Sequence, residues 1–328
     1  MSKSFSLRSG VSVKHISDAA QDALNTIHIA RTSGHPVLLC RHSKVNKLLL
    51  GGWQFDKTYV IGARSGSGKS SYLNMLYQDF LNPQLNGNYP VPFRILHFAL
   101  EMSASDEVLR STSGYSKTPY RDLLSADHQL DDEKYNHSRQ VLERLAHQNM
   151  YFVEDSLTVN QIKDTIMDFH SMEQGQLIVG IDHTLLARRF DERSEVELIT
   201  NLSHTMLQVR KTTGCMMIPI VQFNDEIESP ENIRNKYFHY PRKRYFHGSK
   251  AIWHDADFVF GLHVPEKLGI SKYGPNDYFT KDVLFMHFLK GRFVEDGQLV
   301  RFHNHLKIGE LIQWEDPGVQ ADLKYSEK

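Results

Sequence analysis

The chain has 328 residues, of which 40% are hydrophobic and 23% charged, a composition typical of a globular protein that can bury one large core or two smaller ones. This composition excludes a disordered chain, a collagen and a coiled coil. The formal net charge is −1, so the molecule lacks the overall positive field of proteins that coat DNA, and any nucleic-acid site must be local.

The N-terminal segment is serine-rich and basic. It lacks the apolar run of a secretory signal, which leaves a mitochondrial transit peptide as the alternative interpretation of residues 1–14. Residues 16–30 then place apolar side chains at three- and four-residue steps, which predicts an amphipathic helix. We expect residues 1–43 to be an extension that carries this helix. No stretch approaches the roughly 18 apolar residues of a membrane span, so we expect no membrane association.

Short apolar segments with helical patterns between most of the earlier ones follow in residues 44–328. They predict buried strands at 58–62, 94–100, 150–153, 177–181, 217–223, 258–264 and 283–289, with a helix at 69–81 after the first strand. Strands that alternate with helices predict an α/β fold, with a mostly parallel central sheet covered by helices on both faces.

A glycine-rich segment, ARSGSGKS at 63–70, lies between the first strand and its helix, as a phosphate-binding P-loop requires. Gly66 and Gly68 let backbone N–H groups turn towards a phosphate at the positive end of the helix. Lys69 would reach the β and γ phosphates, and the Ser70 hydroxyl would bind Mg²⁺. An alanine replaces the usual first glycine. The predicted nucleotide contacts are Arg64, Ser65, Gly66, Ser67, Gly68, Lys69, Ser70 and Ser71; a chance glycine-serine turn is the alternative.

Two acidic residues follow predicted strands. Asp182 comes directly after 177–181 and would hold Mg²⁺ together with Ser70, the alternative being a turn or a helix cap. Glu101 comes directly after 94–100, at the sheet edge where phosphate-facing residues collect. It could orient or deprotonate an attacking water, or it could be an acid favoured by a helix N-terminus.

Residues 225–250 lack helical or strand periodicity and are longer than an ordinary connection, which favours a functional loop. Its second half combines cations with the aromatic residues Tyr237, Phe238, Tyr240, Tyr245 and Phe246, a composition suited to phosphates and unstacked bases of single-stranded nucleic acid. The predicted DNA contacts are Arg234, Lys236, Arg242, Lys243, Arg244 and Lys250, with Arg188, Arg189 and Arg193 as a second group. A solvated loop is the alternative.

Six motifs occur in an order that resembles the RecA-like motor domain of the DnaB-like replicative helicases, over about residues 44–300. They are Gly62-Ala63-Arg64; Leu100-Glu101-Met102-Ser103-Ala104 with Arg110; Ile181-Asp182; Gln222-Phe223-Asn224; Ser249 with Ala251-Ile252 and Asp255-Ala256-Asp257; and Lys290-Gly291-Arg292. Asp182-His183 and Leu289-Lys290-Gly291-Arg292-Phe293 look closer to the ring helicases of phages. The sequence departs from the family at His247, Gly248 and Lys250, which leaves the individual DNA contacts open.

The resemblance implies roles for particular residues. Glu101 matches the catalytic glutamate, and Gln222 matches the polar residue that senses the γ phosphate. Lys290 and Arg292 match the lysine and the arginine finger that one subunit inserts into its neighbour's ATP site. The basic loop matches the lining of a central channel.

The activity implied by the resemblance is that of an ATP-driven 5′-to-3′ DNA helicase. It would use ATP or another NTP with Mg²⁺, and it would form a homo-hexamer around single-stranded DNA. The helix at 16–30 would dock on a neighbouring subunit. The chain shows no zinc-binding primase module and no second P-loop, so we expect it to encode neither priming nor a double-ring motor. A separate primase and a separate helicase loader are candidate partners. A RecA/RadA-like recombinase and an ATP-binding DNA-loading scaffold without turnover are the alternatives.

The cysteines and histidines indicate neither a disulfide framework nor a structural metal site. Cys40 and Cys215 cannot form a disulfide framework, which favours a reducing, cytoplasmic setting, the host cytoplasm if the protein is phage-encoded. His303 and His305 lack further ligands at metal-binding spacing, so we expect no structural metal.

Overall fold

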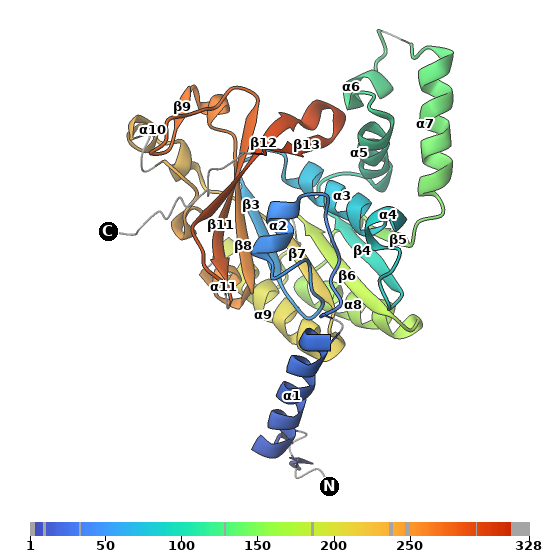
Figure 1. The fold of residues 1–328 in the computed structure, drawn as a ribbon, viewed down its shortest axis with the longest axis vertical. Helices are drawn as coiled ribbons and strands as arrows, with labels where there is room; N and C mark the ends of the chain where they lie inside the picture. The colour runs from blue at the N-terminus through green and yellow to red at the C-terminus, as the bar shows by residue number, and fades with distance from the viewer. Residues whose placement is uncertain are drawn as a thin grey trace. The chain divides into compact units, whose positions relative to one another are not determined.

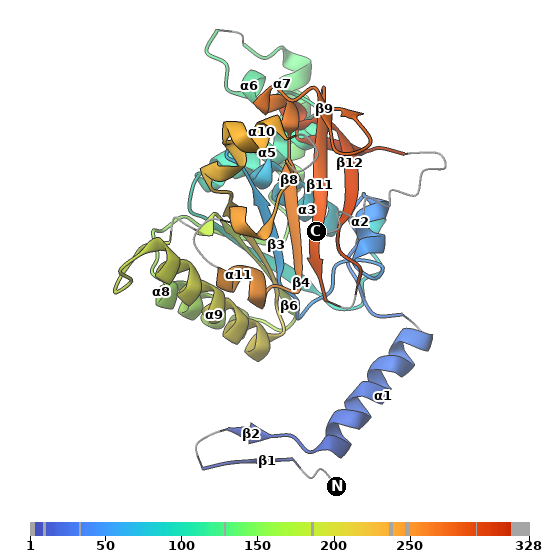
Figure 2. The ribbon, with the colours of Figure 1, turned by 90° about the vertical axis from the view of Figure 1, so that its left-hand side faces the viewer.

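The computed structural model describes residues 4–8, 11–32, 34–127, 129–184, 187–235, 239–246, 250–292 and 294–315. The chain forms two compact units, Met1–Val37 and Leu38–Lys328. The first unit contains an antiparallel hairpin of β1 (Phe5–Ser6) and β2 (Ser12–Val13), followed by α1 (Ile16–Thr32) (Figure 2). The predicted helix is confirmed, and none of the α1 residues is buried.

The second unit is built on a nine-stranded sheet in the order β13-β12-β11-β8-β3-β7-β6-β4-β5 (Figure 1). The strands from β5 to β8 in this order run parallel, whereas β11, β12 and β13 are antiparallel. The prediction of a mostly parallel sheet is confirmed. The strands are β3 (Tyr59–Ala63), β4 (Phe93–Ala99), β5 (Met150–Val153), β6 (Gln176–Asp182), β7 (Met216–Gln222), β8 (Phe258–His263), β11 (Val283–Gly291), β12 (Gln298–His305) and β13 (Glu310–Gln313).

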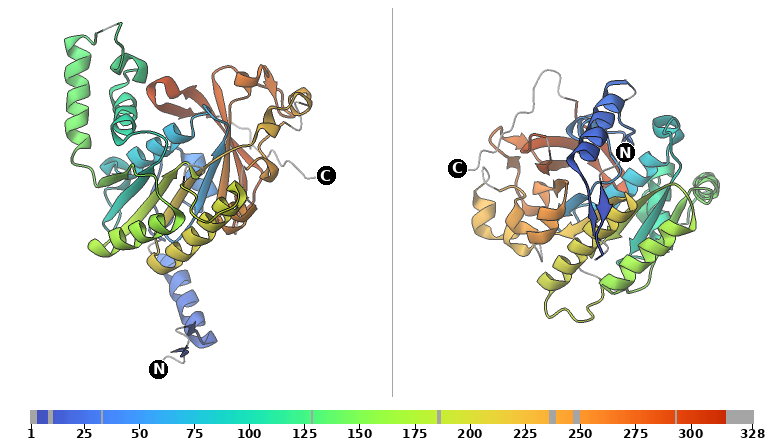
Figure 3. Two further views of the ribbon diagram at one scale, coloured as in Figure 1. Left: turned by 180° about the vertical axis from the view of Figure 1, so that it is seen from behind. Right: turned by 90° about the horizontal axis from the view of Figure 1, so that it is seen from below.

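Helices cover both faces of this sheet, as predicted (Figures 1 and 3). In β3, Tyr59 and Ile61 join the core beneath α3, whereas Val60 joins the core beneath α8 and α9, because successive strand residues point to opposite faces. The helices are α2 (Ser43–Leu48), α3 (Lys69–Phe80), α4 (Pro83–Asn86), α5 (Ala104–Ser116), α6 (Tyr120–Leu123), α7 (Asp132–Leu145), α8 (Val159–Met172), α9 (Glu195–Thr213), α10 (Pro230–Arg234) and α11 (Lys250–Asp255). None of the described helices is long and apolar enough to cross a membrane.

Short elements complete the described chain. A small antiparallel hairpin precedes β11, and four single-turn 3₁₀ helices lie in connections. The hairpin strands are β9 (Lys272–Tyr273) and β10 (Tyr278–Phe279), and the 3₁₀ helices are η2 (Asp225–Glu228), η3 (Lys243–Tyr245), η4 (Pro265–Leu268) and η5 (Leu306–Ile308).

Polar side chains cap the N-termini of several helices that follow strands. The Ser103 hydroxyl accepts the Asp106 N–H at the start of α5, and Ser194 does the same for Glu197 at the start of α9. At α8, Thr158 and Gln161 form a reciprocal capping box. These caps satisfy N–H groups that have no partner within the helix, so each helix starts at a defined residue.

The second unit begins earlier than the predicted start at residue 44. Leu38, Cys40 and His42 are buried in its core, and His42 Nε2 donates to the Leu311 carbonyl oxygen over 2.9 Å. This bond ties the segment before α2 to the edge strand β13. The periodicity of so short a segment does not indicate that it is buried.

Candidate nucleotide and DNA sites

The P-loop connects β3 to α3 and leaves helix N–H groups for a ligand. Gly66 and Gly68 have φ angles of +69° and +91°, in the left-handed region that glycine adopts without strain. Among the described residues, no side chain caps the first turn of α3. Ala63, which replaces the usual glycine, is the last residue of β3, where extended backbone accepts a side chain. The loop therefore retains the geometry that binds phosphates.

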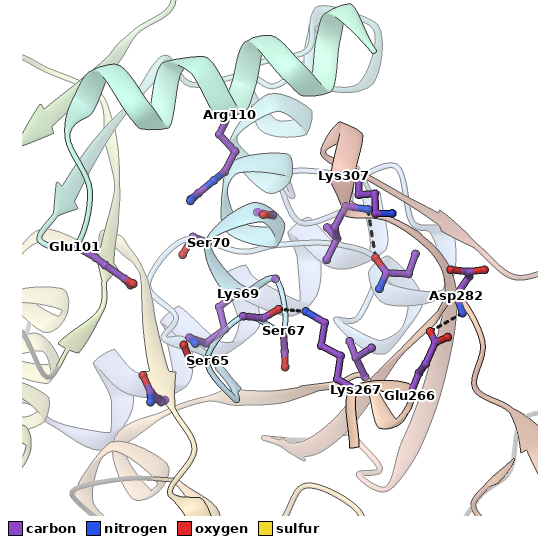
Figure 4. A pocket seen from close by; sticks show the side chains of 17 residues that line it. Ser65, Ser67, Lys69, Ser70, Glu101, Arg110, Glu266, Lys267, Asp282 and Lys307 are labelled. Atoms are coloured by element: carbon purple, nitrogen blue, oxygen red, sulfur yellow. Dashed lines mark hydrogen bonds between the residues drawn. The ribbon is translucent and has the colours of Figure 1, made fainter. Parts of the chain in front are cut away.

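The P-loop opens onto a cavity of about 460 Å³ (Figure 4). The predicted residues that line it are Ser65, Gly66, Ser67, Gly68, Lys69, Ser70, Ser71, Glu101 and Gln222. Arg64 is the exception among the predicted contacts, because its side chain turns away to pair with Glu228 and does not line the cavity. The structure thus gathers the ends of β3, β4 and β7 at one place.

Lys69 is the first residue of α3 and lines the cavity. Its side chain is buried, and Nζ donates to the backbone oxygen of Arg64 over 3.1 Å. Burial lowers the pKa of Lys69, while the carboxylates of Asp182 and Glu101 act in the opposite direction. The ammonium lies in the joint field of two carboxylates and close to the phosphate-binding backbone.

Asp182 ends β6 and is 3% exposed. The Ser70 hydroxyl donates to its carboxylate, but the Oδ1 atom has no hydrogen-bond partner among the described residues. Burial raises the pKa of Asp182, and the nearby Glu101 carboxylate adds to the increase. A buried carboxylate oxygen without a donor costs free energy, so a cation beside Ser70 and Asp182 would satisfy it.

Glu101 follows β4, and its side chain reaches into the cavity from the side opposite Lys267 (Figure 4). About half of the side chain is exposed, which leaves the carboxylate accessible to water. His183 Nε2 lies 4.0 Å from Glu101 Oε2, and burial lowers the pKa of this imidazole.

The connection after β8 and the segments next to the antiparallel strands supply cavity residues that the sequence analysis did not identify. They are Val264, Glu266, Lys267, Asp282, Asn304, Leu306 and Lys307. Lys267 Nζ donates to the Gly66 oxygen, and a Cβ at Gly68 would overlap Leu306. Arg110 also lines the cavity, and Glu107 pairs with its guanidinium over 2.9 Å. Arg110 belonged to a recognisable motif, whereas the others had no local signal.

Lys290 and Arg292 do not line the cavity of the same chain. Lys290 lies near the end of β11, and its ammonium donates to backbone oxygens at the end of α11. Arg292 Nε lies 3.4 Å from Asp257 Oδ1, and 46% of the arginine side chain remains exposed.

The predicted basic loop is partly ordered by its own acidic residues. Arg244 pairs with Glu226 over 3.1 Å, and the Arg242 guanidinium lies 4.3 Å from the centre of the Tyr240 ring. Lys243 Nζ donates to His254 Nε2 over 3.0 Å. Arg234 and Lys250 are exposed, whereas Lys236, Tyr237 and Phe238 lie outside the described residues.

The prediction that Tyr245 and Phe246 offer faces to bases is wrong. Tyr245 is fully buried and Phe246 is 6% exposed, since both belong to the core on the α9 side of the sheet. Phe246 packs on Phe223 with ring centres 5.0 Å apart, and a Cβ at Gly62 would overlap the Phe246 ring. The loop is therefore anchored directly on the strand that leads into the P-loop.

The second basic group lies in the connection after β6. Arg188 and Arg189 are exposed, as is Arg193, and Arg188 Nη2 donates to Gln161 Oε1 over 3.3 Å.

A family model described as the DnaB-like helicase C-terminal domain matches residues 41–283. The fold is similar to a solved structure described as an ATPase domain, with a TM-score of 0.73 and 15% identity over 90% of this chain and 98% of that one. It is also similar to a DnaB-like replicative helicase described with its interactions with primase, with a TM-score of 0.74 and 16% identity over 94% of this chain and 69% of that one. No curated protein sequence matches the chain.

Proposed function

The chain belongs to the DnaB-like helicase family and is an ATP-hydrolysing replicative helicase motor with a RecA-like fold, and from this premise we propose that it acts as a ring of identical subunits on single-stranded DNA. One observation carries the proposal. The P-loop, Glu101 and Gln222 share one cavity, but Lys290 and Arg292, which match the family's lysine and arginine finger, lie outside it. A complete catalytic site then needs a second subunit.

The nucleotide would bind with its phosphates over the P-loop. Backbone N–H groups of Gly66 to Ser71 would surround the phosphates, and Lys69 would contact the β and γ groups. Ser70 and the unpartnered oxygen of Asp182 would hold Mg²⁺, which neutralises phosphate charge when bound.

Hydrolysis would depend on residues that already face the same space. Glu101 would orient the attacking water and accept its proton, and its exposed carboxylate supports that role. Gln222 ends β7, directly before the residues that contact the basic loop, so it could sense the γ phosphate and pass its presence to that loop. Arg292 would stabilise the charge of the transferring phosphoryl group in the neighbouring subunit.

DNA would bind along the cations of the loop between β7 and α11. Arg234, Arg242, Lys243, Arg244 and Lys250 would contact phosphates, as would Lys236 beyond the described residues. Arg188 and Arg189 would extend this surface. Part of the support is the exposure of most of these cations; among the described ones, Arg242 and Lys243 are half-buried. The loop is also anchored next to the nucleotide site, because Arg64 of the P-loop pairs with Glu228 of the same loop.

Assembly would use the N-terminal unit. No residue of α1 is buried within the chain, and Ile16, Leu24 and Ile27 are 76%, 58% and 64% exposed. An apolar helix face of this kind is stabilised by a partner, and we propose that α1 docks on a neighbouring subunit of a hexamer. We further propose 5′-to-3′ movement, a separate primase and loader, and work in the cytoplasm.

Electron microscopy of the protein with an ATP analogue and oligo-dT tests the assembly, and ATPase assays with and without DNA test the motor. We expect closed six-membered rings and DNA-stimulated turnover. Helical filaments would instead favour a recombinase. Nucleotide binding without turnover would favour a loading scaffold.

A further inference from the structure

The ammonium of Lys290 is fully engaged inside its own subunit. Its Nζ donates to the backbone oxygens of Trp253, His254 and Ala256 at 2.6, 3.0 and 2.7 Å. An ammonium has three donors, so these bonds use all of them. The oxygens belong to the end of α11, where unpaired carbonyls and the negative end of the helix dipole favour a cation.

A β-bulge directs Lys290 to this place. Phe288 pairs with Phe260 of β8, but Lys290 pairs with Val259, so β11 contains one extra residue at Leu289. Without the bulge, Lys290 would share a face with Phe288, which packs in the core beneath α3. With the bulge, it shares the face of Val259, which is the face that α11 covers. Bulges commonly re-aim a side chain in this way.

The end of α11 and the residues directly after it also contact the proposed finger and the proposed DNA loop. The backbone N–H of Arg292 donates to the backbone oxygen of Asp257 over 2.9 Å, and the Arg292 guanidinium lies beside the Asp257 carboxylate. At the other end, Lys243 of the loop contacts the His254 ring, and the His254 oxygen accepts from Lys290. A continuous set of contacts thus runs from the loop through α11 to the end of β11.

We propose that Lys290 is a positioning residue that clamps the end of β11 to α11, so that DNA held by the loop sets the place of Arg292. This inference rests on the proposed function, because it takes Arg292 as the finger and the loop as the DNA site. It differs from the role implied by the resemblance, since Lys290 acts within its own subunit and not on the neighbour's phosphate.

The substitution Lys290→Met removes the ammonium and keeps most of the side-chain volume. Hydrogen exchange of the peptide spanning residues 250–257, measured without nucleotide, should become about fivefold faster, the factor expected for loss of a helix-end cation. Saturating DNA should no longer stimulate ATPase, while the KM for ATP stays within about twofold, because the cavity is unchanged. Lys211→Met, at the C-terminal turn of α9, is the matched control and should retain DNA stimulation.

A double substitution separates positioning from direct contact with phosphate. If Lys290 acts through Arg292, then Lys290→Met in an Arg292→Ala background should change the remaining ATPase by less than about twofold. A further fall of tenfold or more would overturn the inference and place Lys290 on the neighbour's phosphate. Full DNA stimulation in Lys290→Met, with faster exchange of 250–257, would reduce the clamp to a purely structural contact and also overturn it.

Two different outcomes for DNA-stimulated ATPase separate the proposed function from the role of Lys290. A wild-type protein without DNA-stimulated ATPase would contradict the proposed function, and the inference with it. A stimulated wild type with an equally stimulated Lys290→Met contradicts the inference alone.

Discussion

Lys243 and Arg244 are neighbours in the proposed DNA loop, but their surroundings predict different contributions to DNA binding. Lys243 Nζ contacts His254 Nε2 at 3.0 Å, whereas Arg244 already pairs with the Glu226 carboxylate at 3.1 Å. A phosphate that binds Arg244 must compete with this carboxylate. We therefore expect Lys243→Ala to remove close to one full phosphate contact and Arg244→Ala to remove clearly less.

The expected size follows from counterion release. Each phosphate contact with single-stranded DNA contributes ~0.7 to the slope of log K against log salt, so Lys243→Ala should flatten the slope by about that amount. Between ~50 and ~200 mM salt, the lost contact corresponds to a change of about 2.6-fold in relative affinity. Arg244→Ala should flatten the slope by less than about half as much, because Glu226 offsets part of its charge.

Fluorescence anisotropy with labelled oligo-dT at several salt concentrations measures both slopes. Glu226→Gln releases Arg244 and should steepen the slope, which tests the competition directly. Lys134→Ala on α7, a lysine that pairs with Asp131 over 3.3 Å, is the control and should leave the slope unchanged. Equal effects of Lys243→Ala and Arg244→Ala would refute the role given to Glu226, and no effect of either would move the DNA site to Arg188 and Arg189.

Three further predictions concern the nucleotide site. Lys69→Ala should abolish nucleotide binding or turnover, whereas Glu101→Gln should retain bound ATP and hydrolyse it at least ~100-fold more slowly, as expected for loss of a general base; near-normal turnover by Glu101→Gln would contradict its assignment. Mixing Arg292→Ala subunits, which should retain only a low residual ATPase, with inactive Lys69→Ala subunits should raise the ATPase above that residual level, since mixed rings contain interfaces with both an intact P-loop and an intact finger. No increase in rings whose mixing is confirmed by mass would exclude action in trans. Gly68→Ala should weaken nucleotide binding about tenfold or more, because a left-handed alanine costs ~1–2 kcal/mol and its Cβ would overlap Leu306. An unchanged Kd for a fluorescent nucleotide would show that the loop relaxes.

The sequence predicted the parallel half of the sheet because its strands are continuous apolar runs between helical segments. The site residues at the ends of those strands were predictable for the same reason. Asp182, Glu101 and Gln222 each end or follow a strand, and the carboxyl ends of parallel strands meet at one edge. The strands β12 and β13 carry weaker signals, since β12 mixes buried and exposed residues and β13 is short.

The remaining features depend on contacts between distant segments. Lys267 follows β8 and Leu306 follows β12, and both reach the P-loop only because these later strands join the sheet on one side of β3. No local pattern encodes that placement. Composition alone marked Tyr245 as a base-stacking residue, although it is fully buried. The side-chain alternation of β11 would place Lys290 beside Phe288, and only the bulge reverses this.

The packing of Leu306 on Gly68 also affects the order in which a working site can form during synthesis. The P-loop leaves the ribosome early, and Glu101 and Gln222 follow. The 3₁₀ helix η5, which carries Leu306, emerges only after β8, β11 and β12. Chains fold from the N-terminus as they emerge, so a nascent chain carries the phosphate-binding elements for some time without the wall that encloses them. Nucleotide would then be held firmly only when the C-terminal strands have joined the sheet, and the finished motor domain, not a fragment of it, would be the first species to bind it well.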